Sequence, residues 1–398
     1  MREPDQRVQG RQEVEMDRRR FLGRLAMGCS VAASPLVTPV ALASAPWEER
    51  LVVIVLRGAM DGLDAVRPVF DRAYAPLRPT LDEGGLNGGD GWALHPALEP
   101  LLPLWRAGEA GAVHAVSTPY RDRRSHFDGQ DILEAGSGGA DLMGVRDGWL
   151  NRMLGAVPGV VAETAYAIGR ENMKVLSGPV AVTRWSPDAR LTLSPQARRL
   201  LEAVYHPDPL FREASEQAVA IVDGLMEEGV GAGRAGHVEL AAFAAGRLRG
   251  ETRIASFSLG GWDTHRGQRA NLSDALGRLG ETILTLREGL GPVWGRTAVL
   301  CMTEFGRTAR ENGTGGTDHG TGGAMLFAGG ALRGGRVVAS WPGLGEGDLY
   351  AGRDLLPTRD VRAHAAWVMR GLFGLDRAVL EGAVFPGLDL GGDPGLLL

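Results

Sequence analysis

Short apolar runs alternate with amphipathic segments along most of this chain. Five runs rich in β-branched and other apolar residues are typical of strands buried on both faces, namely residues 51–56, 112–116, 253–259, 297–302 and 324–327. Between and after them, apolar residues recur at helical spacing in residues 96–105, 126–134, 195–205, 211–226, 238–248, 269–293 and 358–373. Strands that alternate with helices predict an α/β fold with a mostly parallel central sheet and helices on both faces.

The first residues follow a different pattern. Asp17-Arg18-Arg19-Arg20-Phe21-Leu22 precedes a moderately apolar stretch, which ends in Ala41-Leu42-Ala43. Consecutive arginines, an apolar stretch and a small-residue cleavage pattern are typical of a twin-arginine export signal. The apolar stretch is interrupted by Arg24 and two prolines, so it does not suit a membrane span.

We therefore expect residues 1–43 to be a signal that the twin-arginine export machinery reads and that is then removed. Residues 44–398 would form a single domain in the periplasm or outside the cell, without a stable membrane anchor. Cleavage would remove one of the two cysteines, and Cys301 alone cannot form an internal disulfide.

Composition excludes two classes of function. The formal net charge is −5 and no basic cluster dominates the predicted domain, so the chain has no nucleic-acid footprint. Lys174 is the only lysine, which excludes a Walker-type phosphate loop with its lysine. With 398 residues, of which 44% are hydrophobic, the chain is long enough to build one large core.

Polar residues cluster directly after the predicted strands. The clusters are Arg57 to Asp64, Arg124 to Asp128, Gly260 to His265 and Glu304 to Gly320. Open α/β sheets bind ligands just outside the carboxyl ends of their strands, so these segments are expected to form one site. They supply the carboxylate oxygens and imidazole nitrogens that a divalent cation binds.

Four of these motifs and the end of the chain carry a family resemblance. The segments are residues 56–63, Ser125-His126-Phe127-Asp128, Gly260-Gly261-Trp262-Asp263-Thr264-His265, residues 303–308 with 316–320, and Val384-Phe385-Pro386-Gly387. Together with the leader they resemble a widespread family of twin-arginine-exported bacterial proteins of unsettled function, related to the alkaline phosphatases and sulfatases. The resemblance implies an alkaline-phosphatase-like α/β fold and a metal-dependent site.

The resemblance also implies roles for individual residues. Asp61, Asp263, His265, Glu304 and His319 would bind metal, and Ser125 would stand at the position of the nucleophile. The implied cofactor is a divalent metal, with zinc first and calcium, magnesium or manganese as alternatives. Phe305 stands where the superfamily has a histidine ligand, and Asp263 and His265 are closer in sequence than the usual pair, so one metal site fits this chain better than two.

Several of these residues also have a structural interpretation. Ser125 can be an ordinary helix N-cap with Asp128 three residues later, and His126 can be a ligand or a packed helix-start residue. Asp263 and His265 point to the same side if the chain is extended, which favours joint coordination. Arg307 suits an oxyanion, but a salt bridge to Glu304 or Glu311 would also use its guanidinium.

The expected function is hydrolysis of a small phosphate or sulfate ester by a metal-dependent exported enzyme, with Ser125 and Arg307 as catalytic residues. The alternative is a non-catalytic periplasmic protein that binds metal or anions on the same fold. Glycines on both sides of Asp318 and His319 would permit close approach of the backbone to an anion or a metal ligand, and a simple flexible loop is the alternative explanation.

Overall fold

The computed structural model describes residues 47–121, 123–138, 145–187 and 236–398. The leader and the helices expected at residues 195–205 and 211–226 lie outside these ranges. The described residues belong to one compact unit, Ser44–Leu398. None of its described helices is long and apolar enough to cross a membrane.

The unit is built on a sheet of nine strands in the order β11-β5-β10-β9-β1-β8-β6-β7, with β12 beside β5. The strands are β1 (Arg50–Arg57), β5 (Ala110–Ser117), β6 (Ala165–Ile168), β7 (Thr183–Trp185), β8 (Ile254–Gly260), β9 (Thr297–Met302), β10 (Gly323–Ala328), β11 (Val337–Val338) and β12 (Arg359–Asp360). Strand β1 pairs in parallel with β8 and β9, and only β10 runs antiparallel to its neighbours in this sheet. The predicted mostly parallel sheet is confirmed.

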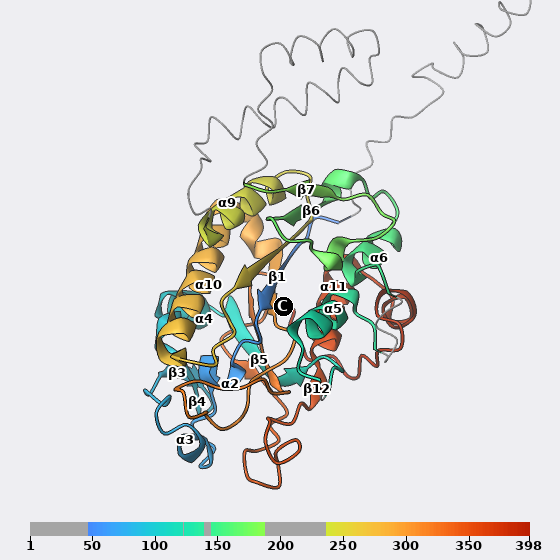
Figure 1. The fold of residues 1–398 in the computed structure, drawn as a ribbon. Helices are drawn as coiled ribbons and strands as arrows, with labels where there is room; N and C mark the ends of the chain where they lie inside the picture. The colour runs from blue at the N-terminus through green and yellow to red at the C-terminus, as the bar shows by residue number, and fades with distance from the viewer. Residues whose placement is uncertain (1–46, 122, 139–144, 188–235) are drawn as a thin grey trace, which may run out of the picture. The chain divides into compact units, whose positions relative to one another are not determined.

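Strand β1 is apolar throughout because both of its faces are covered. Leu51, Val53 and Val55 belong to one hydrophobic core, whereas Val52, Ile54 and Leu56 belong to the other. Helices α4 (Leu102–Arg106), α9 (His237–Leu248) and α10 (Gln268–Leu290) lie on one side of the sheet, and α5 (His126–Ala135), α6 (Trp149–Gly155) and α11 (Val361–Phe373) lie on the other (Figure 1). Full burial of alternating side chains on both faces is the pattern expected of a central parallel strand.

All five predicted strands are present, and the differences lie mainly in the helices. Residues 96–105 divide into a 3-10 helix, η1 (Pro96–Leu101), and α4, because Pro100 and Pro103 lack the amide hydrogen of a continuous α-helix. The predicted helix at 269–293 ends at Leu290, where Gly291 adopts a positive φ of 53°. The chain continues as the 3-10 helix η4 (Gly291–Arg296).

Most elements of two to five residues, and the seven-residue helix α6, were not predicted, because so few positions show no clear periodicity. A second sheet contains β2 (Val66–Arg67), β4 (Trp92–Leu94) and β3 (Leu86–Gly89) in that order. The other short helices are α2 (Gly62–Ala65), α3 (Tyr74–Leu77), η2 (Ala162–Thr164), η3 (Lys174–Leu176), α12 (Arg377–Val379) and a π-helical turn, η5 (Leu380–Val384).

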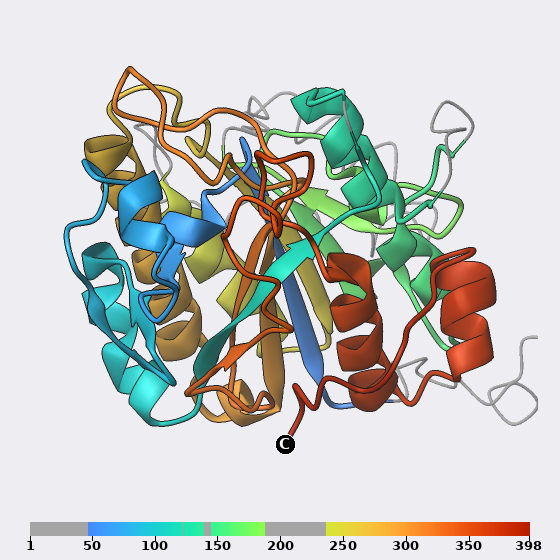
Figure 2. The ribbon, with the colours of Figure 1, turned by 90° about the horizontal axis from the view of Figure 1, so that it is seen from below.

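The loops after β1, β8 and β9 gather at one edge of the sheet. Figure 2 shows the loops that follow β9 beside helix α5 at this edge, and the C-terminus at the opposite edge. The polar clusters read from the sequence lie on these loops and at the beginning of α5. The parallel topology therefore brings them together, as expected for an open α/β sheet.

Two buried histidines away from this edge differ in their surroundings. His114 on β5 has its Nε2 atom 3.1 Å from the carbonyl oxygens of both Gly62 and Val66, and its Nδ1 accepts a hydrogen bond from the Ala115 amide. Neither ring nitrogen of His364 on α11 has a hydrogen-bond partner among the described residues. Burial lowers the pKa of His114 to about 4 and that of His364 to about 3.

We predict that His364→Leu stabilises the protein, because it removes a buried imidazole without partners. The free energy of unfolding should rise by about 1 kcal/mol at pH 7. The gain should grow by roughly 2 kcal/mol at pH 5, because the unfolded chain then binds a proton that folded His364 does not bind, and each pH unit is worth about 1.4 kcal/mol.

The measurement is urea unfolding at pH 7 and pH 5. His114→Leu is the matched control and should destabilise the protein, since it leaves the Ala115 amide without its acceptor. A loss of stability in His364→Leu at both pH values would contradict the account.

Candidate metal centre

The carboxylate of Glu304 organises one side of the site. This side chain follows β9 and is fully buried. Its Oε1 atom accepts hydrogen bonds from the backbone amides of Gly58 and Ala59 at 2.9 and 3.1 Å, and from Gln130 at 3.1 Å. The Nδ1 atom of His126 lies 2.8 Å from the same oxygen. Glu304 thereby joins the loop after β1 to the first turn of α5.

The pKa of Glu304 reflects two opposing effects. Burial alone would raise it, but the hydrogen bonds, with that of His126 the largest, hold it below its ordinary value. Glu304 is therefore ionised at neutral pH, and its Oε1 is occupied by protein donors. This placement suits orientation of His126 better than the predicted direct ligation of a metal.

Arg307 lies beneath the site rather than at its mouth. Its guanidinium is buried and donates to the carbonyl oxygens of Gly58, Ala59, Trp262 and Thr317 at 2.9 to 3.2 Å. It also forms an ion pair with Asp263. Because these donors are directed at the protein, the predicted role of Arg307 as an oxyanion clamp does not fit its position, and the partner of its salt bridge is neither Glu304 nor Glu311.

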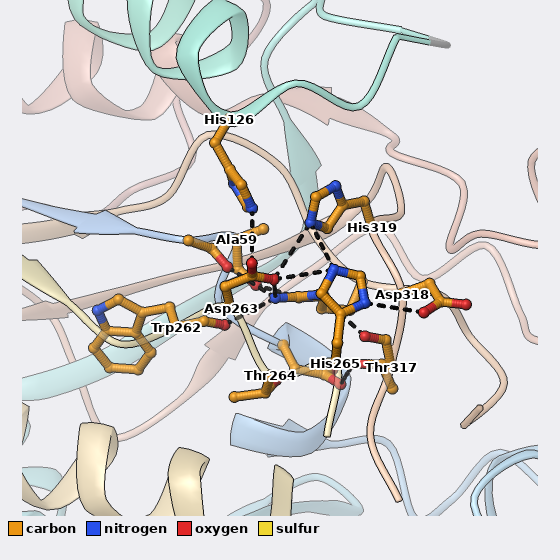
Figure 3. Close-up of polar contacts among 12 residues, drawn as sticks. Ala59, His126, Trp262, Asp263, Thr264, His265, Thr317, Asp318 and His319 are labelled. Carbon is orange, nitrogen blue, oxygen red and sulfur yellow. Dashed lines mark hydrogen bonds and ion pairs between the residues drawn. The ribbon is translucent and has the colours of Figure 1, made fainter. Parts of the chain in front are cut away.

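Three histidine side chains converge on Asp263, which follows β8 (Figure 3). Oδ1 of Asp263 lies 3.2 Å from Nε2 of His265 and 3.3 Å from Nε2 of His319, and its Oδ2 lies 3.5 Å from Nε2 of His126. One ligand atom each from His126, Asp263 and His319 lie within 4.8 Å of one another. We call His126, Asp263, His265 and His319 the histidine cluster.

Each histidine of the cluster has its other ring nitrogen next to an oxygen of the protein. Nδ1 of His126 faces Glu304, Nδ1 of His265 lies 3.0 Å from Oδ1 of Asp318, and Nδ1 of His319 lies 2.8 Å from the carbonyl oxygen of Arg124. A hydrogen on Nδ1 satisfies each of these oxygens and leaves the Nε2 lone pair directed at Asp263. Histidines that bind metal are commonly oriented in this way by a carboxylate or a carbonyl.

In that arrangement, none of the three Nε2 lone pairs faces a hydrogen-bond donor among the described residues. The Nε2 atoms of His265 and His319 are 2.9 Å apart, and two lone pairs at this distance repel unless a cation lies near them. Nε2 of His126 is buried and makes no hydrogen bond among the described residues. The donor set therefore fits a positively charged occupant.

Burial and these contacts shift the pKa values of His126, His319 and Asp263. The hydrogen bond to Glu304 is the main cause of the raised pKa of His126. Burial lowers the pKa of His319, which favours the neutral ring that a metal requires. Burial opposes ionisation of Asp263, but its contacts with Arg307 keep its pKa below the ordinary value.

Asp61 lies outside the cluster. Its buried carboxylate accepts hydrogen bonds from Arg78 and Gln268 at 2.8 Å and from Thr317 at 3.0 Å, and it caps helix α2 through the Asp64 amide. Burial raises its pKa, but the Arg78 guanidinium more than offsets this effect. The predicted role of Asp61 as a ligand does not match a carboxylate already bound by three protein side chains.

Ser125 is the N-cap of α5, as one of its two interpretations expected. Its Oγ accepts a long hydrogen bond of 3.4 Å from the Asp128 amide. The two residues beside it both contact the cluster, Arg124 through its carbonyl oxygen and His126 through its ring. Arg124 has a positive φ of 56°, a conformation that costs energy for a residue with a side chain and is found preferentially at functional sites.

Phe305 packs against the cluster instead of binding metal. Its ring is stacked on that of His126, with centroids 5.3 Å apart, and on that of Tyr120. It therefore holds the plane of His126. The sequence left His126 open between a ligand role and a packing role. Its position at the start of a helix that follows a strand end was the signal for the ligand role.

Glycines permit the close approach of loops around Asp318 and His319. A Cβ atom on Gly316 would lie 2.3 Å from the carbonyl oxygen of Thr264, and one on Gly320 would lie 2.3 Å from the carbonyl carbon of Arg307. Both distances are impossible for any other residue without movement of the backbone. At these two positions the glycines permit close contact with the backbone of neighbouring loops.

Residues 116–383 match the family described as "Protein of unknown function (DUF1501)", and the chain belongs to this family. The match includes all four residues of the histidine cluster. None of the curated proteins matches the chain.

Three solved structures resemble parts of this chain at low sequence identity. The lipoteichoic acid synthase LtaP from Listeria monocytogenes has a TM-score of 0.41 and 7% identity, over 89% of this chain and 80% of that one. A protein in the alkaline phosphatase superfamily from Vibrio parahaemolyticus has a TM-score of 0.35 and 12% identity, over 81% and 71%. The protein Ps i-CgsB has a TM-score of 0.38 and 10% identity, over 82% and 72%.

We predict that His126→Ala and His319→Ala each remove bound metal. Each variant loses an imidazole from the cluster, so metal content by elemental analysis should fall from stoichiometric to near zero, and the melting temperature should fall with it. His237→Ala is the control, because His237 pairs with Glu281 on the surface of α10 and should not affect metal content. Equal metal content in all three variants would refute the cluster as a metal site.

A second prediction separates orientation from ligation by Glu304. Glu304→Gln keeps the shape of the side chain but weakens the acceptor for Nδ1 of His126. Loss of an orienting partner should lower metal affinity by about 10-fold to 100-fold. Titration of metal into chelator-treated protein measures this change. Complete loss of binding, equal to that of His126→Ala, would instead make Glu304 a direct ligand.

Proposed function

We propose that this member of the DUF1501 family is an exported, metal-dependent hydrolase of phosphate or sulfate esters. The observation that carries the proposal is the histidine cluster, in which three oriented imidazoles and one carboxylate face a common point at the carboxyl edge of the sheet. Hydrolysis would add water across the ester bond and give an alcohol and the free anion. The distant structural relatives supply no part of this argument.

His126, Asp263 and His319 would hold the metal, with His265 at its side. Imidazole nitrogen with one carboxylate oxygen favours zinc over calcium or magnesium, which bind oxygen ligands almost exclusively. Manganese remains compatible with this mixed set. When bound, such a cation supplies Lewis-acid polarisation of an ester oxygen.

Ser125 is the candidate nucleophile or water-positioning group. Helix α5 has ten residues, and the positive end of its dipole and its unpaired amides favour a bound anion beside this hydroxyl. The hydroxyl accepts the long hydrogen bond from the Asp128 amide, and the side chain of Tyr120 also interacts with it. A hydroxyl both donates and accepts, so its hydrogen can be given up in a reaction. Attack by Ser125 on the phosphorus or sulfur atom would break the bond to the alcohol, which leaves, and the hydrogen of the hydroxyl would pass to water. Water would then hydrolyse the serine ester and release the free anion.

One observation favours the alternative of a non-catalytic metal-binding or anion-binding protein. The guanidinium of Arg307, expected to hold the substrate anion, is committed to the protein. A protein that only binds metal would keep the metal site without needing a clamp for the anion. Metal analysis followed by a panel of phosphate monoesters, phosphodiesters and sulfate esters distinguishes the two, since only a hydrolase turns over a member of the panel.

Export is part of the proposal and is supported by the leader. The arginines at 18 to 20, followed by an apolar stretch and Ala41-Leu42-Ala43, favour delivery to the periplasm or beyond by the twin-arginine machinery. That route carries folded proteins, which suits a chain that acquires metal before export.

We predict that Ser125→Ala removes nearly all ester hydrolysis while metal content is unchanged. Loss of the hydroxyl abolishes covalent attack but leaves the histidine cluster intact. Initial rates on the best ester of the panel, with metal content measured on the same sample, test this. If Ser125 is only a cap, the variant should lose about 1 kcal/mol of stability and keep turnover within several-fold.

A further inference from the structure

A cavity of ≈ 650 Å³ lies beside the histidine cluster and has no assigned role. It lies between α3, the loop of residues 308–318 and the loop of residues 344–353. Its volume is in the range of cavities that hold small organic molecules. We call it the Asp318 cavity, after the residue that it shares with the surroundings of the cluster.

Three residues that line the cavity also contact the histidine cluster. Asp318 faces Nδ1 of His265, and Asn312 donates a hydrogen bond of 3.0 Å to the carbonyl oxygen of His265. Arg353 donates to the carbonyl oxygen of His319 at 2.9 Å. A molecule in the cavity would therefore be separated from the cluster by a single layer of side chains. Since the side chains of Asp318 and His265 are about half exposed, it could also pass over them.

The walls of the cavity are held in place by hydrogen bonds, those of Arg78 being buried. Arg78 donates to the carbonyl oxygens of Thr308 and Ala309 at 2.8 and 3.0 Å. The carboxylate of Glu311 accepts from the backbone amides of Thr80 and Leu81. These contacts fix the 308–318 loop against the segment that follows α3. A preformed site of this kind binds without a large cost of ordering.

The two sides of the cavity differ in chemistry. Leu77, Leu344 and Leu349 form an apolar side together with neighbouring small residues. The polar side carries both donors and acceptors. Within the described part of the chain, the guanidinium of Arg310 has no partner, and Oδ2 of Asp318 accepts no hydrogen bond. Glu346 is exposed at the margin.

This pattern selects the ligand class. Mixed charges on the polar side disfavour a ligand with several charges of one sign. Hydroxyl groups both donate and accept, so they can satisfy Arg310 and Asp318 at once. A ring or chain of carbon atoms that carries hydroxyls also offers C–H groups to the three leucines. The ligand that fits both sides of the cavity is therefore a neutral, polyhydroxylated group.

We propose that the Asp318 cavity binds the alcohol part of the ester, and that this part is a sugar or another polyol. The inference rests on the proposed function for its place in the reaction, since the alcohol would be released when the ester bond is broken. It does not rest on that function for the binding itself.

Binding of methyl α-glucoside to the full-length, metal-containing protein tests the inference, because this sugar has no bond that the proposed reaction would break. Saturation-transfer NMR should show binding to the wild type. Leu349→Trp, which fills the cavity, should weaken it by at least about tenfold, and Arg310→Ala should weaken it several-fold. Leu356→Trp is the control, because Leu356 is exposed and does not line the cavity.

The outcomes separate this inference from the proposed function. Binding that is lost in Leu349→Trp but kept in Leu356→Trp supports the sugar site even if no ester is hydrolysed. Absence of glucoside binding to the wild type, or equal binding in both variants, overturns it even if esters are hydrolysed. Preferential binding of 1-hexanol over the glucoside would likewise overturn the polyol class. Melting curves of both variants confirm that each is folded.

When hydrolysis is present, a kinetic comparison adds a second test. Leu349→Trp should lower kcat/KM for glucose 6-phosphate or its sulfate counterpart by about tenfold and leave the methyl ester within about twofold. Equal loss on both esters would place the effect at the metal centre and contradict the role of the cavity.

Discussion

The buried guanidinium of Arg307 is the interaction on which this site depends. It follows β9, and its donors bind carbonyl oxygens of the loop after β1, the loop after β8 and the segment that carries His319. It also pairs with Asp263, the carboxylate on which the histidines converge. Glu304, three residues earlier, ties α5 to the same loops. Glu304 and Arg307, two opposite charges on one short segment, thus set the relative positions of the loops after β1 and β8, the segment that carries His319 and helix α5. Burial of Arg307 without these acceptors would be strongly unfavourable.

The central fold could be predicted because its signals are strong and local. Strands such as β1 and β9 are continuous apolar runs, since both faces of the sheet are covered, and the alternation with helices indicated a parallel sheet. Elements such as β11 and β12 contain two residues each and exist only through pairing with β5. Such pairing depends on contacts between residues far apart in the sequence, so no local pattern predicts it.

The site was predicted in part for a related reason. The rule that polar segments after strand ends meet at one edge of the sheet predicted that Asp263, His265 and His319 are neighbours, as they are. The same rule does not say which charged residues become buried. Glu304, Arg307 and Asp61 carry the right chemistry for ligands or clamps, but each is enclosed by donors or acceptors from distant segments. Their burial and partners suit a supporting role better than a direct one. Nε2 of His126, by contrast, has no hydrogen-bond partner among the described residues.

The most direct test of the account is the anomalous X-ray signal of zinc in crystals of the protein grown with zinc. The account predicts a peak about 2.0 to 2.2 Å from Nε2 of His126, Nε2 of His319 and a carboxylate oxygen of Asp263. In this arrangement Glu304 and Asp61 keep their present protein partners. A peak coordinated by Glu304 or Asp61, or no peak among the three histidines, would contradict the central claim that oriented imidazoles around Asp263 form the metal site.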